Sequence, residues 1–293
     1  MKNLIKYYYN LDVTNIRQVG DIYYLTIDNN NYMLCICDSN VINEMCDLLK
    51  NDLNYHKLIL TTNNEKFVLF NNINYSLFKI NTIFRKVELD DIMNSSIFVS
   101  YDNSNEIVNK WINLWSDHID YIEYQIDEYK TKYPYLEKII YYYIGMAENS
   151  IQLLKSSNIN SINKYIAHKR IGTSTNLVEL YNPCYTTIDT RVRDIAEYFK
   201  NIFFYSDEEK NSLYLKINYC LQMLDNNEKI LFFIRMLYPS YFFDIYDDII
   251  LNKKENSILS QITSKNVEYE RFLKNILNEI KKTTYIDNID WLV

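Results

Sequence analysis

Glycine and proline are scarce in this chain, since each occurs only three times in 293 residues. Turns must therefore be built mainly from Asn, Asp and Ser, which tolerate left-handed backbone at some cost. A glycine-rich loop, which wraps around the phosphates of a nucleotide in many phosphotransferases, is not supported by this composition. The single glycine near such a position is Gly20, in RQVGDIYY, and one glycine in a hairpin is ordinary turn chemistry.

Clusters of positive charge are also missing. The net charge is −7, and Lys and Arg never gather beyond adjacent pairs. This excludes the basic footprint of a nucleic-acid-binding protein and a polybasic membrane patch. No segment approaches the roughly 18 apolar residues that span a bilayer, and the N-terminal stretch lacks the pattern of a secretory signal. We therefore expect a cytoplasmic protein with neither a nucleic-acid nor a membrane partner.

The spacing of the cysteines does not indicate a metal site or a set of disulfide bonds. There are five of them, and they are scattered: Cys35, Cys37, Cys46, Cys184 and Cys220. The first two share one face of an expected strand, but no matching pair of Cys or His residues follows. Reduced cysteines in the core are the favoured interpretation.

The composition is that of a globular protein, with 48% hydrophobic and 24% charged residues. Up to about residue 80 the apolar pattern predicts strands around one helix, which spans 39–52 with Ser39 as its N-cap. The strands are expected at 4–9, 16–19, 22–27, 32–37, 57–60, 67–70 and 75–80, with the 57–60 and 67–70 runs forming a hairpin.

From about residue 88 the apolar spacing becomes helical. The sequence thus predicts an α+β, bilobal, protein-kinase-like fold. Its lobes are a small N-terminal one with an antiparallel sheet and one helix, residues 1–83, and a larger, mainly helical one, residues 84–293.

The stretch 165–199 contains the strongest candidate site. Kinase-type phosphotransferases use a loop of the form H-x-D-x-x-x-x-N, followed by an Asp at the end of a later strand. Here the loop begins at His168, has Arg170 in place of the catalytic Asp, and reaches Asn176 one residue late; the later acid is Asp189. The catalytic loop is therefore degenerate, and this second lobe carries it.

Arginine cannot accept a proton, so Arg170 abolishes the usual base if this alignment holds. The residue is either a surface arginine or, as we favour, the partner of Asp189 or Asp194 in an ion pair. Asn176 and Asp189 together could hold Mg²⁺ through oxygen atoms. Equally, Asn176 could be a polar loop residue and Asp189 a helix cap. For His168 we expect a structural role.

Four stretches in the second lobe resemble a known family. They are 134–152 (PYLEKIIYYYIGMAENSIQ), 189–199 (DTRVRDIAEYF), 238–243 (YPSYFF) and 290–292 (DWL). They are similar to the spore coat-associated CotS/YutH proteins, within the aminoglycoside phosphotransferase and choline kinase group. The resemblance implies a protein-kinase-like fold, Mg²⁺–ATP as the cofactor of the active relatives, and other spore coat proteins as partners.

Three functions follow as hypotheses. The first is a pseudokinase that acts as a binding or scaffold protein, because the third strand, YMLCICD, also lacks the lysine that pairs with phosphates. The second is an active small-molecule kinase of the aminoglycoside or choline type, in which Glu179 replaces the missing base. The third is a module that binds nucleotide without turnover.

Overall fold

The computed structural model describes residues 1–102, 105–129, 131–159 and 161–292. The chain divides into two compact units. Unit 1 comprises Met1–Ile97 and Ile166–Ile188, and unit 2 comprises Phe98–Tyr165 and Asp189–Val293. The boundary predicted after residue 83 falls inside the first segment of unit 1, and the loop from His168 to Asn176 belongs to unit 1.

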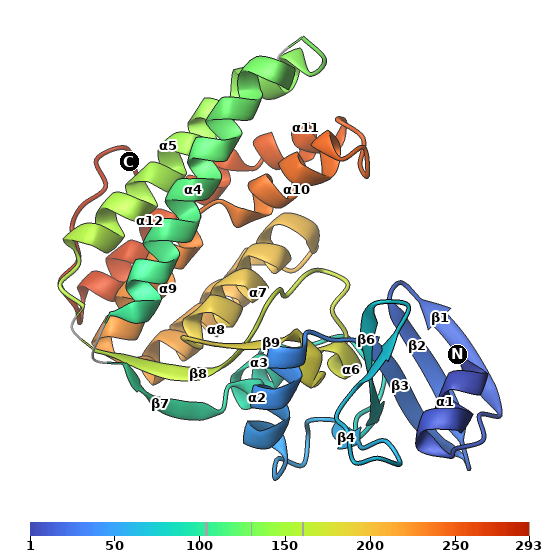
Figure 1. Ribbon diagram of the computed structural model, residues 1–293. Coiled ribbons are helices and arrows are strands. Elements are labelled where there is room, and N and C mark those ends of the chain that lie inside the picture. Colours follow the sequence, from blue (N-terminus) through green and yellow to red (C-terminus); the bar gives the residue numbers. More distant parts are fainter. Residues whose placement is uncertain (103–104, 130, 160, 293) are drawn as a thin grey trace. The chain divides into compact units, whose positions relative to one another are not determined.

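Unit 1 is built on an antiparallel sheet with the strand order β1-β2-β3-β6-β4, to which β5 adds by pairing with β6 (Figure 1). The strands are β1 (Asn15–Val19), β2 (Ile22–Ile27), β3 (Asn30–Ile36), β4 (Lys57–Ile59), β5 (Val68–Phe70) and β6 (Ile73–Lys79). The helices of this unit are α1 (Lys2–Tyr9), α2 (Ser39–Leu49), α3 (Leu89–Ser95) and α6 (Leu177–Leu180), followed by the 3₁₀ turn η1 (Pro183–Tyr185).

Asparagine and aspartate make the hairpin turns of this sheet, as the scarcity of glycine predicts. Asp28 and Asn29 join β2 to β3 with φ of 48° and 62°, and Asn71 and Asn72 join β5 to β6 with φ of 51° and 60°. Two successive residues with positive φ give the turn whose twist matches paired strands. Gly20, with φ of 56°, serves the β1–β2 turn.

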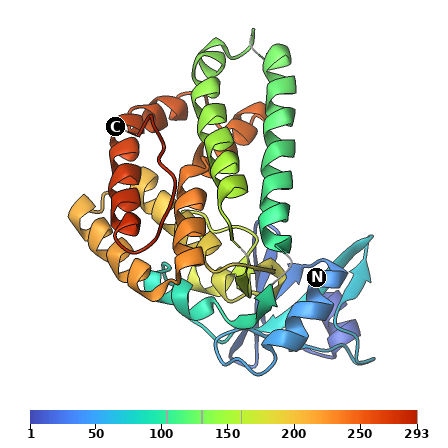
Figure 2. The ribbon, with the colours of Figure 1, turned by 90° about the vertical axis from the view of Figure 1, so that its left-hand side faces the viewer.

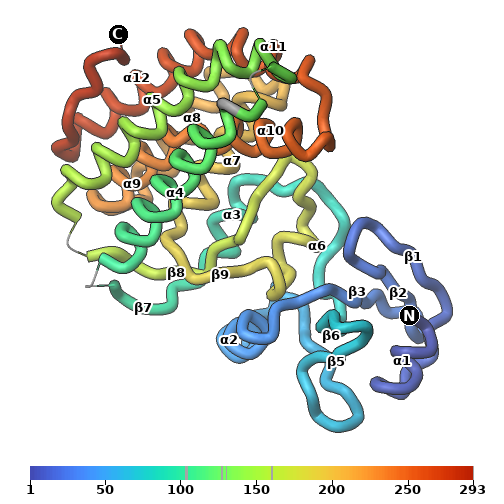
Figure 3. Tube along the Cα trace, turned by 45° about the horizontal axis from the view of Figure 1, so that its top comes forward, coloured from blue at the N-terminus to red at the C-terminus, as the bar shows by residue number. Residues whose placement is uncertain are grey.

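Three local predictions for unit 1 were wrong. Residues 4–9 are helical, because Leu4, Ile5 and Tyr9 lie on one side of α1 and pack on the sheet. The runs at 57–60 and 67–70 do not form a hairpin, since β4 and β5 each pair with β6. Strands β5 and β6 lie side by side in Figure 3. The turn at Asn71 and Asn72 favours β5–β6 pairing instead. The N-cap of α2 is Asp38, whose carboxylate accepts two backbone N–H groups.

Unit 2 is mainly helical. Its helices are α4 (Glu106–Tyr129), α5 (Pro134–Ser156), α7 (Val192–Tyr205), α8 (Lys210–Met223), α9 (Asn226–Leu237), α10 (Ser240–Ile250), α11 (Ile258–Thr263) and α12 (Asn266–Lys281). The long helices α4 and α5 lie side by side (Figures 1 and 2). Strand β7 (Phe98–Asp102) pairs with the first residues of β8 (Ile162–His168). Residues 166–168 of β8 and 186–188 of β9 (Thr186–Asp189) belong to unit 1.

Stacked aromatic rings fill the interior of unit 2. Tyr143 lies 3.6 Å from Phe242 and Phe204 lies 3.8 Å from Tyr241, measured between ring centroids. All four side chains are buried. These four rings therefore belong to the core of unit 2. In the part of the chain that the structure describes, no helix is both long and apolar enough to cross a membrane.

Candidate functional site

One face of the unit 1 sheet is covered by the segment 177–185. Side chains two residues apart on a strand share a face, so Met33, Cys35 and Cys37 point the same way. All three are buried in one apolar cluster with Val178 and Cys184. Kinase-type enzymes carry their phosphate-binding lysine on the third strand of this sheet. In this protein, the face that carries Met33, Cys35 and Cys37 packs directly against the segment 177–185.

A disulfide between Cys37 and Cys184 fastens this packing, with Cα atoms 5.3 Å apart. The prediction of five reduced cysteines was therefore wrong for this pair. The two residues are 147 positions apart, and only the fold brings them together. Cys35, Cys46 and Cys220 lie outside the disulfide, and burial raises the pKa of the Cys35 thiol to about 12.

Buried polar groups fix the same segment. The His56 Nε2–H donates to the Val178 carbonyl over 2.8 Å, and the His56 backbone N–H donates to the Tyr181 carbonyl over 3.1 Å. His56 Nδ1 accepts the Asn81 N–H. Burial lowers the pKa of His56 to about 4, so the imidazole is neutral at pH 7 and one nitrogen is available as an acceptor. The Asn182 amide donates to the Cys35 sulfur.

His168 lies at the end of β8 and is 2% exposed. Its Nε2 is 2.6 Å from the Leu180 carbonyl oxygen, which ties the loop to the covering segment and matches the structural role expected for it. Arg170 follows β8 and is exposed. Its ion pair with Asp189 or Asp194 stays a prediction, because those two acids belong to unit 2.

Asn176 caps the short helix α6. Its Oδ1 accepts the backbone N–H groups of Val178 and Glu179 at 3.0 and 3.1 Å, and its amide nitrogen donates to the Glu179 carboxylate at 2.9 Å. Burial raises the pKa of Glu179. The whole Asn176 amide thus has protein partners in this structure, and its role as a Mg²⁺ ligand stays a prediction.

If capping is the function of Asn176, then Asn176→Ala should lower the free energy of unfolding by about 1 kcal/mol, the usual value of a lost N-cap. Urea unfolding with and without Mg²⁺ measures this. We expect the same loss in both conditions and near wild-type stability for Asn176→Asp, whose carboxylate also caps. A loss that appears only with Mg²⁺ would identify Asn176 as a metal ligand.

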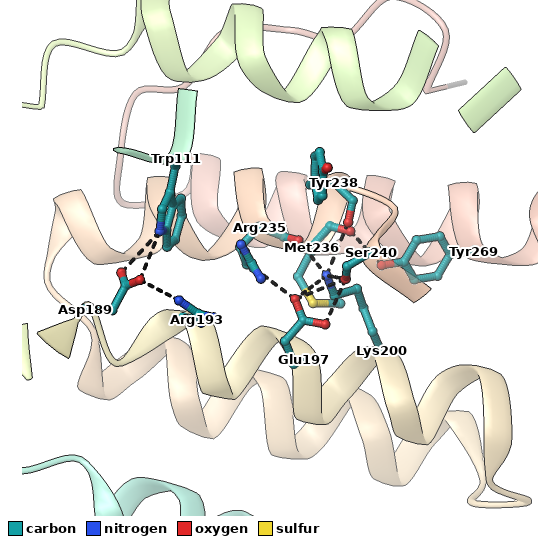
Figure 4. Close-up of polar contacts among 10 residues, drawn as sticks. All are labelled: Trp111, Asp189, Arg193, Glu197, Lys200, Arg235, Met236, Tyr238, Ser240 and Tyr269. Atoms are coloured by element: carbon teal, nitrogen blue, oxygen red, sulfur yellow. Dashed lines mark hydrogen bonds and ion pairs between the residues drawn. The ribbon is translucent and has the colours of Figure 1, made fainter. Parts of the chain in front are cut away.

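In unit 2, Asp189 is completely buried at the end of β9, three residues before α7 (Figure 4). Its Oδ1 accepts the Trp111 indole N–H at 3.2 Å and the Thr190 backbone N–H at 2.8 Å. Its Oδ2 accepts from the Arg193 guanidinium at 2.8 Å. Burial works against the charge of Arg193, but Asp189 and Asp194 outweigh it and raise the pKa of Arg193. A cation of the protein therefore neutralises Asp189, the other predicted Mg²⁺ ligand.

A second buried ion cluster lies farther along α7 (Figure 4). Glu197 Oε1 accepts from Lys200 Nζ at 2.8 Å and from Arg235 Nε at 2.9 Å, and its Oε2 accepts from the Ser240 hydroxyl at 2.8 Å. Lys200 also donates to the carbonyls of Arg235 and Tyr238. The cluster joins α7 to α9 and α10.

Burial alone would raise the pKa of Glu197, but Lys200 and Arg235 lower it to about 2. Burial lowers the pKa of Lys200 to about 8, against the attraction of Glu197. Sequence reasoning missed this cluster and the Asp189–Arg193 pair. The available signal was the spacing of charges at 193, 197 and 200, which places them along one side of α7, with Asp189 four residues before Arg193. Within the described residues, no group of three or more His, Cys, Asp or Glu side chains could hold a metal ion.

In its fold, this chain is similar to the protein-kinase-like phosphotransferases. One similar structure is an aminoglycoside phosphotransferase from Alicyclobacillus acidocaldarius subsp. acidocaldarius, with 10% identity and a TM-score of 0.67 over 96% of this chain and 97% of that chain. Another is spectinomycin phosphotransferase APH(9)-Ia in an AMP-bound complex, with 10% identity and a TM-score of 0.58 over the same shares. These likenesses confirm the predicted fold class.

A family model described as "Spore coat putative kinase YutH" matches residues 2–276, so the chain belongs to this family. The resemblance stated from the four sequence stretches is therefore confirmed. No curated protein matches the chain.

Proposed function

We propose that this protein is a catalytically inactive, kinase-like protein that serves as a binding or scaffold component of the spore coat. The observation that carries the proposal is the covered sheet face. The third strand, which carries a lysine for the nucleotide phosphates in an active relative, has none here. Next to it, Cys37 is bonded to Cys184, and Val178 packs in the same cluster. A nucleotide on that face would have to displace packed, cross-linked chain.

The chemistry of the loop supports the same proposal. Phosphoryl transfer depends on positioning the nucleotide and on neutralising charge, with a carboxylate to orient the attacking hydroxyl. Arg170 takes the position of that carboxylate and cannot accept a proton. The third strand has no lysine for Glu44 of α2 to pair with, and Glu44 is exposed. The positioning groups and the base are thus both lacking.

The surroundings of Asp189 add a third argument. A carboxylate that binds Mg²⁺ keeps an oxygen open toward metal and phosphate. Both oxygens of Asp189 accept hydrogen bonds from protein groups, and Arg193 supplies the compensating charge. A bound metal ion would have to compete with this guanidinium.

An assay of ADP release with aminoglycosides, choline and small amino alcohols as acceptors tests the proposal. We expect no acceptor-dependent release above that of an ATP-only control. Release that depends on an acceptor and disappears in Glu179→Gln would overturn the proposal. The association with the coat is tested separately, by fractionating spores of the source organism and probing the coat layer for this protein.

The second candidate is an active small-molecule kinase that uses Glu179 as its base. One observation favours it: burial raises the pKa of this half-buried carboxyl group, the direction that suits a general base near neutral pH. Two observations argue against this candidate. The Glu179 carboxylate accepts a hydrogen bond from the Asn176 amide, and Glu179 lies in the first turn of α6.

A further inference from the structure

A pocket of unit 2 lies between the last turns of α5 and the segment that follows α12. Its volume is about 410 Å³, and sites for small ligands have volumes of roughly 300–1,000 Å³. Ile286, Ile289 and Leu292 are buried and anchor the second wall on the unit. The Ser156 hydroxyl donates to the Asp287 carboxylate at 3.1 Å and joins the two walls. Both walls of the pocket are therefore held in place.

The pocket brings together two of the sequence stretches that resemble the family. Asn149 and Gln152 belong to the stretch in α5, and Asp290 and Trp291 belong to the DWL stretch. Neither stretch contributes to the covered sheet face or to the ion clusters of α7. The four side chains are two amides, a carboxylate and an indole ring, which are groups that bind ligands in polar pockets.

The lining carries negative charge without a balancing positive charge. Asp287 and Asp290 line the pocket, and no Lys, Arg or His side chain of the described residues does. The hydrogen bonds that the Asp287 carboxylate accepts come from two hydroxyl groups, which carry no charge. Lys281, the last residue of α12, donates to Asn288 and to neither acid. A cationic ligand therefore finds two carboxylates that no described side chain neutralises.

Three of the lining side chains keep unused hydrogen-bond acceptors. In the part of the chain that the structure describes, no group binds the Gln152 side chain or the Asp290 carboxylate. The Asn149 amide nitrogen donates to the Gly145 carbonyl at 2.6 Å, so its Oδ1 stays available as an acceptor. An ammonium group offers three N–H donors and no acceptor. The indole ring of Trp291, on the same lining, attracts cations over its face.

We propose that this pocket binds an aliphatic diamine or polyamine. The ammonium groups of the ligand pair with the Asp287 and Asp290 carboxylates and donate to the free amide oxygens. The alkyl chain packs against Leu153 and Trp291, which also line the pocket. This goes beyond the proposed function and does not depend on catalytic inactivity.

Isothermal titration of the full chain with hexamethylenediamine, at low salt, measures the binding. We expect saturable binding at one site per chain, with a Kd below about 1 mM. The matched ligand is hexamethylene glycol, which has the same alkyl chain and carries hydroxyl groups in place of the ammonium groups. It should show no saturable binding, because it offers no charge to the two carboxylates.

The test variants are Asp290→Asn and Gln152→Leu. Asp290→Asn keeps the shape of the side chain but removes its charge, and we expect it to weaken the binding of the diamine at least about tenfold. Gln152→Leu removes an uncharged acceptor and should weaken the binding about threefold. Both residues are exposed, and circular dichroism checks that the fold is retained.

The matched control is Asp120→Asn, which removes the same charge from an exposed aspartate of α4, outside the pocket. It should leave the Kd unchanged within about twofold. A chain that shows no saturable binding of the diamine overturns the proposal. So does binding that Asp290→Asn does not weaken, that Asp120→Asn weakens equally, or that the glycol shows with a similar Kd.

Discussion

Reduction of the Cys37–Cys184 disulfide should lower the free energy of unfolding by about 2–5 kcal/mol. The bond joins residues 147 positions apart, and a cross-link that closes so long a loop restricts the unfolded chain strongly. Urea unfolding followed by circular dichroism, with and without reductant, measures the difference. Cys37→Ala/Cys184→Ala should match the reduced protein and show no further response to reductant.

Alkylation under denaturing conditions tests the same bond directly. Without reductant, three cysteines should react, Cys35, Cys46 and Cys220, and after reduction all five should react. Cys46→Ala is the control for loss of a buried thiol outside the bond, and it should retain the response to reductant. Five reactive thiols before reduction would contradict the assignment of the disulfide.

Glu197→Gln should destabilise unit 2 by about 3–5 kcal/mol, because it leaves Lys200 and Arg235 buried without their carboxylate. All three tryptophans, Trp111, Trp115 and Trp291, belong to unit 2, so tryptophan fluorescence during urea unfolding reports on this unit. The control is Glu209→Gln, the same substitution at an exposed position, for which we expect a change within about 0.5 kcal/mol.

The stabilisation by Glu197 should also depend on pH. Its pKa falls from an ordinary 4.5 to about 2 in the folded state, so the unfolded chain binds the proton first as pH falls. The contribution, about 3 kcal/mol, is present above pH 4.5 and is lost progressively toward pH 2. Glu197→Gln should lack this part of the acid dependence. An unchanged slope below pH 4.5 would argue against the ion cluster.

Local patterns predicted much of unit 1. The strands β1, β2 and β3 follow from alternating apolar residues and from turns at Gly20 and at Asp28–Asn29, which are short-range signals. Pairing between distant strands is not a short-range signal, and the β4–β5 hairpin was wrong for that reason. The helical nature of residues 2–9 is decided by how Leu4 and Ile5 pack on the sheet.

The candidate site was predictable only in outline. The sequence predicts Arg170 at the position of the base and shows that the third strand has no lysine, because both statements depend on residue type at an expected spacing. The disulfide, the Val178 packing and the Trp111–Asp189 contact join positions far apart in the chain. No local pattern encodes such contacts, so the covered sheet face became visible only in the folded structure.

The most direct test of the central claim, that this sheet face cannot accept a nucleotide, is isothermal titration of the disulfide-bonded protein with Mg²⁺–ATP. We predict no saturable binding at nucleotide concentrations up to about 1 mM. Saturable binding at one site per chain, with a Kd below about 100 µM, would contradict the account.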